Sequence, residues 1–146
     1  MKMLDIRPGS ILMRDHSRAE KRAWEEFSKM IRARDSFDGY FRCPTCGRVL
    51  PIEQADAGHY LSCVRKATKF DEMNVHAQCV TCNRDITFRE KAKSIYRQWL
   101  IKKYGVDSVE LLERISRFGK KYSTAELLLM AKEYKARAKE IMEKKQ

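Results

Sequence analysis

Apolar and polar positions along this 146-residue chain follow a helical period more often than a strand period. Between residues 15 and 35, the positions that would share one helical face recur at steps of three and four: Ala19, Ala23, Phe27, Met30, Ile31 and Arg34, with Trp24 at the edge of the stripe. Residues 1–14 lack this period, and the turn signal Arg7-Pro8-Gly9 predicts an irregular lead.

The second half of the chain predicts three more helices. They span roughly residues 86–104, 107–118 and 123–143. Asp107 with Glu110, and Ser123 with Glu126, have the spacing of capping boxes at the starts of the last two helices. The middle is different: residues 48–62 read as short extended pieces, residues 63–75 as a loop, and residues 76–83 lead into a cysteine pair. The sequence therefore predicts an α+β fold that is mainly helical.

Four of the five cysteines form two matched pairs, Cys43 with Cys46 and Cys79 with Cys82. Two C-x2-C pairs supply the four thiolates of a tetrahedral zinc site, which has no open position and is therefore structural. Two disulfides in a secreted scaffold are the alternative. No apolar run approaches the roughly 18 residues of a membrane span, and the charged start lacks a signal-peptide core. We therefore expect a cytoplasmic, reducing setting without a membrane partner, which favours zinc.

Net charge is +11, and the excess of basic residues is uneven. Residues 43–83 carry four basic and four acidic side chains, whereas residues 84–122 carry eleven basic and five acidic. A neutral centre beside a basic segment suits a polyanion such as DNA, although solvated basic helices would give the same balance. The candidate phosphate-binding residues are Arg65, Lys66 and Lys69 in the predicted loop and Arg84, Arg89, Lys91, Lys93 and Arg97 in the helix after it.

Polar residues between and beside the cysteine pairs stand in a notable order, namely His59, Asn74 and Asn83. This order resembles that of the HNH nucleases, which have the ββα-metal fold. The resemblance implies that His59 activates water, that Asn74 orients His59, and that Asn83 holds a divalent cation against the scissile phosphate. A base with a near-neutral pKa and a hard cation such as Mg²⁺ or Mn²⁺ suit phosphodiester hydrolysis.

The run from Asp56 to Asn83, with Ala67-Thr68-Lys69-Phe70-Asp71 inside it, resembles the phage NinG (Rap) recombination proteins more specifically. Segments on either side extend this resemblance over about residues 20–140. It implies a phage- or prophage-encoded endonuclease, acting in the bacterial cytoplasm on branched recombination intermediates such as Holliday junctions. Many HNH enzymes carry Asp or His before the catalytic His, but Gly58 stands there in this chain. Asp56 or His76 is therefore expected to be the second ligand of the catalytic cation, unless the cation is bound more openly. His76 has a structural hydrogen-bonding role as its alternative.

The expected organisation is one compact unit of four segments. These are the irregular lead 1–14, an N-terminal helical arm 15–42, a zinc-stapled HNH-like core 43–104 and a C-terminal helical extension 105–146. A non-catalytic zinc-ribbon module that binds nucleic acid and an HNH nuclease acting on linear duplex DNA are the competing hypotheses. Symmetric cleavage of a junction favours a homodimer through the predicted helices 15–35 and 123–143, which could equally complete a monomer core. Recombination proteins are possible further partners.

Overall fold

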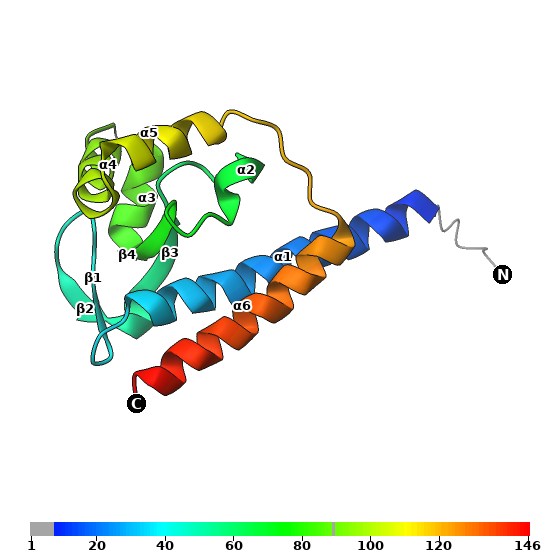
Figure 1. Ribbon diagram of the computed structural model, residues 1–146, viewed down its shortest axis with the longest axis horizontal. Coiled ribbons are helices and arrows are strands. Elements are labelled where there is room, and N and C mark those ends of the chain that lie inside the picture. The colour runs from blue at the N-terminus through cyan, green and yellow to red at the C-terminus, as the bar shows by residue number, and fades with distance from the viewer. Residues whose placement is uncertain (1–7, 89) are drawn as a thin grey trace.

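The computed structural model describes residues 8–88 and 90–146 (Figure 1). The elements follow one another as α1 (Pro8–Asp35), β1 (Tyr40–Arg42), β2 (Val49–Pro51), the 3-10 turn η1 (Ile52–Gln54), β3 (Ala55–His59), α2 (Lys66–Lys69), β4 (Val75–Cys79), α3 (Val80–Phe88), α4 (Glu90–Tyr104), α5 (Val106–Ile115) and α6 (Thr124–Lys144). The predicted α+β, mainly helical class is confirmed.

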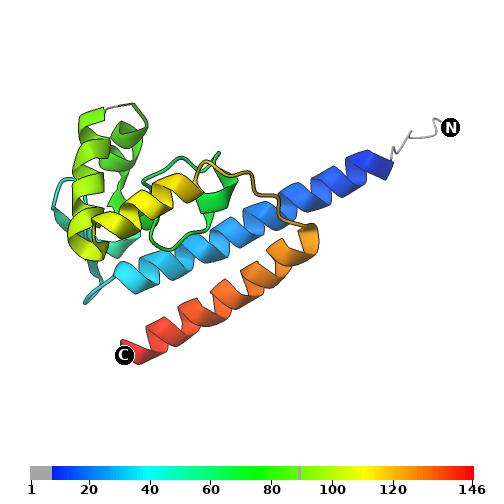
Figure 2. The ribbon, with the colours of Figure 1, turned by 45° about the horizontal axis from the view of Figure 1, so that its top comes forward.

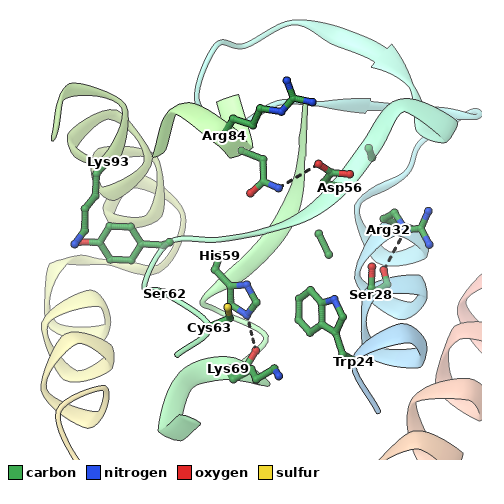
Figure 3. Close-up of a pocket in the computed structure, with 14 residues that line it drawn as sticks. Trp24, Ser28, Arg32, Asp56, His59, Ser62, Cys63, Lys69, Arg84 and Lys93 are labelled. Carbon is green, nitrogen blue, oxygen red and sulfur yellow. Dashed lines mark hydrogen bonds between the residues drawn. The ribbon is translucent and has the colours of Figure 1, made fainter. Parts of the chain in front are cut away.

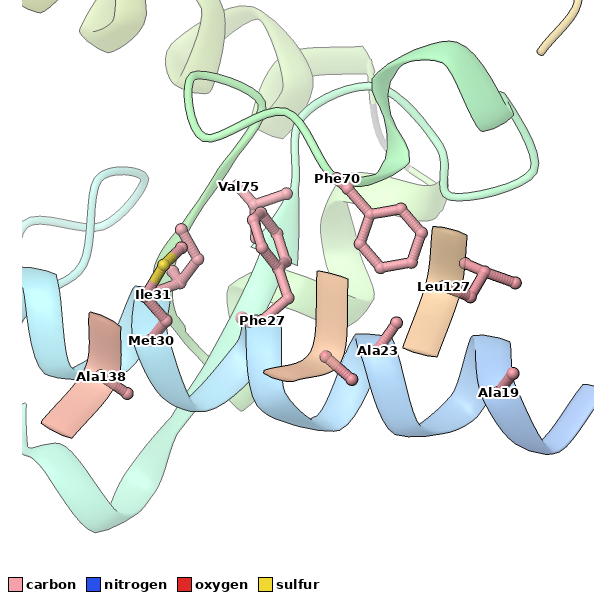
Figure 4. Close-up of a cluster of buried hydrophobic side chains, with 11 residues drawn as sticks. Ala19, Ala23, Phe27, Met30, Ile31, Phe70, Val75, Leu127 and Ala138 are labelled. Atoms are coloured by element: carbon pink, nitrogen blue, oxygen red, sulfur yellow. The ribbon is translucent and has the colours of Figure 1, made fainter. Parts of the chain in front are cut away.

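Two long helices, α1 and α6, lie side by side and run in the same direction (Figures 1 and 2). Near their starts His16 Nδ1 lies 3.2 Å from Thr124 Oγ1, and near their ends Lys145 Nζ donates to the backbone oxygen of Ala33 at 2.6 Å. Their apolar stripes meet in the main core (Figure 4), whose helical members are Ala19, Ala23, Phe27, Met30, Ile31, Leu127, Ala131 and Ala138. Both helices therefore bury their apolar faces within one chain, which is the monomer-core alternative.

A short antiparallel hairpin of β3 and β4 leads directly into α3. In its register Gly58 lies opposite His76, and Asp56 lies opposite Gln78. Since side chains alternate between the faces of a strand, these four residues share one face, and His59 belongs to the other. The core reaches the hairpin on the face of His59 through Ala57 and Val75.

The last two residues of α1 bind the outer edge of β4. Arg34 donates through Nη1 to the backbone oxygen of Glu72 and through Nη2 to that of Val75, each at 2.8 Å. The amide of Ala77 donates to Asp35 Oδ2 at 2.8 Å. A salt bridge of 2.7 Å between Arg34 Nε and Asp35 Oδ1 holds the two side chains together. The hairpin is thus fixed to α1 by polar contacts as well as by the core.

Two smaller apolar clusters complete the interior. One joins α4 and α5 to the end of β3 through Tyr60, Leu61, Tyr96, Leu100, Val109 and Leu112. The other surrounds the cysteine pairs and consists of Phe41, Cys43, Ala55, Ala77 and Cys79. Phe41 is the one large, fully buried side chain of the second cluster among the described residues, and Leu50 and Ile52 pack against it only partly buried, so this cluster has less apolar surface than the main core with which to stabilise its part of the fold.

Three sequence predictions need correction. The lead is helical from Pro8 onward, and proline suits a first helical turn because it lacks the N–H that would have no partner there. The segment predicted as one helix over residues 86–104 contains the end of α3, which begins at Val80, and the separate helix α4 (Glu90–Tyr104), so the second cysteine pair spans a strand end and a helical turn. The capping box predicted for Asp107 and Glu110 is absent, because Gly105, with a φ of 90°, is the N-cap residue of α5 and no side chain caps that helix. The capping box of Ser123 and Glu126 at the start of α6 is confirmed.

None of the helices among residues 8–88 and 90–146 combines the length and the apolar composition that a membrane span requires.

Candidate functional site

The four paired cysteines come together at one end of the hairpin. Their sulfur atoms all lie within 4.8 Å of one another, and none of the four is in a disulfide. Cys43 and Cys46 flank the turn between β1 and β2, where Gly47 takes a φ of 76° that favours glycine. Cys79 ends β4 and Cys82 lies in the first turn of α3.

This donor set fits zinc. Four thiolates at about 2.3 Å from a tetrahedral ion would lie about 3.8 Å apart. The Cys46 and Cys79 sulfurs are 3.9 Å apart, and the backbone amide of Cys82 donates to Cys79 Sγ at 3.4 Å. The four cysteines could therefore hold a structural zinc, as the spacing predicted. Cys63 is exposed and stands outside the cluster.

A cleft of about 1090 Å³ opens beside β3 (Figure 3). The residues of β3 and the turn after it form its floor, α1 forms one wall, and α3 with α4 forms the other. The lining residues are Trp24, Ser28, Arg32, Ala55, Asp56, Ala57, His59, Tyr60, Ser62, Cys63, Lys69, Asn83, Arg84 and Lys93. The wall from α1 was not expected from the sequence. The one available signal was the position of Trp24 at the edge of the apolar stripe.

His59 occupies the end of β3 with its ring inside this cleft. Its Nε2 lies 2.9 Å from the backbone oxygen of Lys69. A carbonyl oxygen can only accept, so Nε2 carries the proton and Nδ1 retains a free lone pair. Trp24 stacks on the imidazole with ring centroids 4.7 Å apart. Burial lowers the pKa of His59 to about 4, although the hydrogen bond that the ring donates to the Lys69 carbonyl acts in the opposite direction. The ring is thus neutral near pH 7 and able to accept a proton at Nδ1.

Asn74 holds the loop that carries the partner of His59. Its side chain is fully buried, and its Oδ1 accepts the amide of Leu61 at 2.7 Å. Its Nδ2 donates to the backbone oxygens of Leu61 at 2.9 Å and Thr68 at 3.0 Å. Neither amide atom is bonded to His59 itself. Asn74 therefore acts on His59 only through the backbone, by fixing the position of Thr68 next to the Lys69 carbonyl.

Asp56 on the floor of the cleft and Asn83 on the wall from α3 contact each other. Asn83 Nδ2 donates to Asp56 Oδ2 at 3.1 Å, which joins β3 to the first turn of α3. Within the described part of the chain, Asn83 Oδ1 and Asp56 Oδ1 make no further hydrogen bond. Two oxygens from neighbouring side chains are hard ligands of the kind that Mg²⁺ and Mn²⁺ prefer.

The sequence as a whole matches one family. The family model described as bacteriophage lambda NinG protein matches residues 6–145. The chain belongs to the NinG family. It is 32% identical to protein ninG of Salmonella phage P22 over 124 residues, which cover 83% of this chain and 56% of that protein. With protein ninG of Escherichia phage 933W it shares 35% identity, and with that of Escherichia phage lambda 34%, each over 96 residues, or 64% of this chain and 43% of the relative.

The chain spans about half the length of these curated NinG relatives. No solved structure matches it.

His76 of this NinG protein stands apart from the cleft. Tyr96 O–H donates to the Gly58 carbonyl at 2.9 Å, and the Tyr96 oxygen lies 3.3 Å from His76 Nδ1, which leaves that nitrogen to donate. Tyr104 O–H donates to His76 Nε2 at 2.8 Å. Burial lowers the pKa of His76 to about 3. Both ring nitrogens of His76 are thus bonded to tyrosines, so the hydrogen bonds of this structure correspond to its structural alternative and leave neither nitrogen open to a cation.

Position 58 has no room for a side chain, so glycine is the residue that fits there. A Cβ at this position would lie 2.0 Å from Gln78 Oε1 and 2.9 Å from Gln78 Cβ. Gln78 is fully buried, its Nε2 donates to Thr45 Oγ1 at 2.7 Å, and its Oε1 has no hydrogen-bond partner among the described residues. The space that a side chain before His59 would use in this NinG protein is therefore filled from the neighbouring strand.

The predicted phosphate-binding residues differ in where they lie and in whether they already have a partner. Lys69, Arg84 and Lys93 line the cleft, as does Arg32, which the sequence did not single out. Lys66 and Lys69 both contact Glu20 of α1 and, mainly through the hydrogen bond from Lys66, lower the pKa of that carboxyl to about 2. Outside the cleft, Arg65 donates to Ser116 Oγ at 3.1 Å, Arg97 pairs with Glu113 at 2.9 Å, and Lys91 is exposed. Arg89 lies outside the described residues.

Proposed function

We propose that this chain is a metal-dependent, structure-specific DNA endonuclease that hydrolyses phosphodiester bonds in branched recombination intermediates such as Holliday junctions. One observation carries the proposal: the neutral imidazole of His59, with Nδ1 free, shares a cleft with the paired oxygens of Asp56 and Asn83. A proton acceptor and a hard-cation site on one cleft are the two components that phosphodiester hydrolysis needs.

The order of elements supports the HNH type. His59 ends the first strand of the hairpin, and Asn83 lies at the start of the helix that follows the second strand. This β3–β4–α3 sequence is the order expected for the ββα-metal fold. The cysteine cluster lies at the other end of β4 from Val75, the residue opposite His59, so a zinc there would stabilise the fold without taking part in the reaction.

In the proposed step a water oxygen attacks the scissile phosphorus. The water proton moves to Nδ1 of His59, the new P–O bond forms, and one P–O ester bond breaks with its electron pair leaving on the sugar oxygen. Solvent protonates that oxygen, and His59 then releases its proton to solvent. Lys69 keeps the ring oriented through its backbone carbonyl, which accepts from Nε2 throughout.

A divalent cation, Mg²⁺ or Mn²⁺, fits at Asp56 and Asn83, where it would neutralise charge on the phosphate and the departing oxygen. Arg84 and Lys93 on one wall and Arg32 on the other would contact phosphates beside the scissile bond.

The test compares cleavage of a four-way DNA junction with cleavage of its linear duplex arms in Mg²⁺. We expect His59→Ala to lower the rate of junction cutting by at least about 100-fold, because proton transfer by a positioned base contributes that much. His16→Ala is the matched control, since His16 lies outside the cleft, and it should cut like the wild type. Near wild-type cutting by His59→Ala would refute the assignment.

Two other outcomes select the competing functions. Junction binding without cutting in Mg²⁺ or Mn²⁺ favours a non-catalytic zinc module, because the cysteine cluster and the basic walls alone explain binding. Equal cutting of junction and linear duplex favours an HNH enzyme without structural selectivity.

We further propose that the protein works in the bacterial cytoplasm on host or phage recombination intermediates, beside recombination proteins. Since a symmetric cut of a junction needs two sites, a homodimer on the DNA is part of this proposal. Light scattering of the protein–junction complex tests the proposed homodimer. A mass that corresponds to one chain per junction would contradict it.

A further inference from the structure

One wall of the cleft continues past the cleft as a basic face of α1. At 3.6 residues per turn, Arg14, Lys21, Ser28 and Arg32 lie within about 40° of one another around the helix axis. Ser28 and Arg32 line the cleft, and Figure 3 shows both on the helix that carries Trp24. Arg14 and Lys21 are exposed and lie on the same face nearer the start of α1. We call these four residues the α1 stripe.

The α1 stripe is not covered by the rest of the chain. The α6 helix packs against Ala19, Ala23 and Met30, which lie on the opposite face of α1 by the same helical geometry. The early turns of α1 also project beyond the body of the molecule (Figures 1 and 2). Nothing within residues 8–88 and 90–146 therefore packs over the Arg14 end of the stripe.

The cations of the α1 stripe are also unpaired. Among the described residues, Arg14, Lys21 and Arg32 form no ion pair; Arg32 Nε only donates to the Ser28 carbonyl of its own helix at 3.4 Å. The basic residues of α2 and α4 differ in this respect, because Lys66 and Lys69 share Glu20, and Arg97 has Glu113. Two carboxylates lie at the margins of the stripe: Glu25, with exposed Arg18 beside it, and Asp35, which is already bound by Arg34 and the amide of Ala77.

The length of the α1 stripe fits a segment of duplex DNA. From Arg14 to Arg32 the helix rises by about 27 Å, which is about eight base pairs of duplex at about 3.4 Å each. We propose that the α1 stripe binds the phosphate backbone of one duplex arm next to the scissile bond and leads it into the cleft. This inference rests on the proposed function and adds to it a second contact surface, outside the cleft, whose partner is double-stranded.

The experiment measures binding and not cutting, so that its failure differs from failure of the proposed nuclease activity. Binding of a four-way junction with arms of about twelve base pairs is followed without Mg²⁺ over a range of salt concentrations. The test variant is Arg14→Gln/Lys21→Gln. The control is Arg22→Gln/Lys29→Gln, which removes the same charge from exposed residues about a quarter-turn round the same helix.

We expect the test variant to bind about tenfold more weakly and its salt slope to fall by about two, because two phosphate contacts are lost. The control should stay within about twofold of the wild type. With arms shortened to about four base pairs, the difference between the test variant and the wild type should disappear, since the arm no longer reaches Lys21 and Arg14.

Equal binding by the test and control variants overturns the inference, even if the wild type cuts junctions as proposed. A loss that persists with short arms also overturns it, because the contact would then not follow the duplex. A wild type that binds no DNA would overturn both the inference and the proposed function. Helical circular dichroism matching that of the wild type confirms that both variants are folded.

Discussion

Trp24 and His59 stack face to face, with their ring planes inclined by 20°, although 34 residues separate them in the sequence. The indole covers the imidazole from the side of α1 and removes it from water. Burial is the main cause that lowers the pKa of His59, so the protonation state of the candidate base depends on a helix outside the hairpin.

Trp24→Leu should therefore raise the pKa of His59 from about 4 toward its ordinary value of 6.5. His59 must be neutral to accept a proton, so activity is lost as pH falls through its pKa, and the acid limb of the pH–rate profile should move to higher pH. Titration of the His59 ring resonances by NMR measures the shift directly. Trp99→Leu serves as control, because Trp99 packs on His76 at 4.8 Å; an unmoved His59 pKa in Trp24→Leu would contradict the prediction.

Gly58→Ala should destabilise the protein by about 1–3 kcal/mol, because the added methyl group meets the buried side chain of Gln78. Gln78→Ala removes the nearest obstacle, the Oε1 atom at 2.0 Å, and leaves only Cβ at 2.9 Å, so the double variant should be more stable than the sum of the two single changes predicts. Urea unfolding of the wild type and the three variants gives the coupling free energy. Strict additivity would mean that Gln78 does not occupy the space over Gly58.

Asn74→Ala should cost at least about 2 kcal/mol of stability, since it leaves the backbone groups of Leu61 and Thr68 buried without partners. It should also lower activity by loosening the Lys69 carbonyl that orients His59. The rate of hydrogen exchange at the Leu61 amide measures how firmly the loop is held, and His59→Ala, which leaves Asn74 in place, is the control variant. A loop amide as protected in Asn74→Ala as in His59→Ala would exclude this role.

Each chain should bind one zinc ion, and removal of the zinc should unfold the region around the cysteines. Apolar packing there consists mainly of Phe41 with the half-buried Leu50 and Ile52, whereas structural zinc sites supply about 10–16 kcal/mol of binding free energy. Metal analysis and thermal unfolding with and without a chelator measure both effects in the wild type. Cys43→Ser should lose the ion and Cys63→Ser should keep it, because Cys63 lies outside the cluster. Retention of zinc by both variants would refute the ligand set.

Local spacing predicted the parts of the fold that depend on near neighbours. The stripe of α1, the capping box at Ser123 and the cysteine pairs all follow from residues a few positions apart, and the structure bears them out. The helix α3 was missed because residues 76–83 were interpreted only as a segment that leads into a cysteine pair. In the structure Cys79 ends β4 and Cys82 lies in the first turn of α3, so the pair spans the junction between a strand and a helix, which the spacing alone does not reveal.

Contacts between distant segments could not be predicted in this way. The two tyrosines that bind His76 lie 20 and 28 residues further along the chain, on α4. Glu20 on α1 forms salt bridges with Lys66 and Lys69, so these two lysines, which were predicted to bind DNA phosphates, already have a carboxylate partner in the free protein. In each case the residue types were visible in the sequence, but the packing of helices on the hairpin decided their partners.

The contacts of Arg34 and Asp35 with β4 have a consequence for association. A further strand added beside β4 would need the carbonyl of Val75 and the amide of Ala77, and those two groups are already bound by the guanidinium and the carboxylate. Exposed strand edges are templates for aggregation, and charged side chains are one means of blocking them. The end of α1 therefore blocks the exposed edge of β4. The two-stranded sheet is thereby kept from pairing with the same strand of another protein molecule.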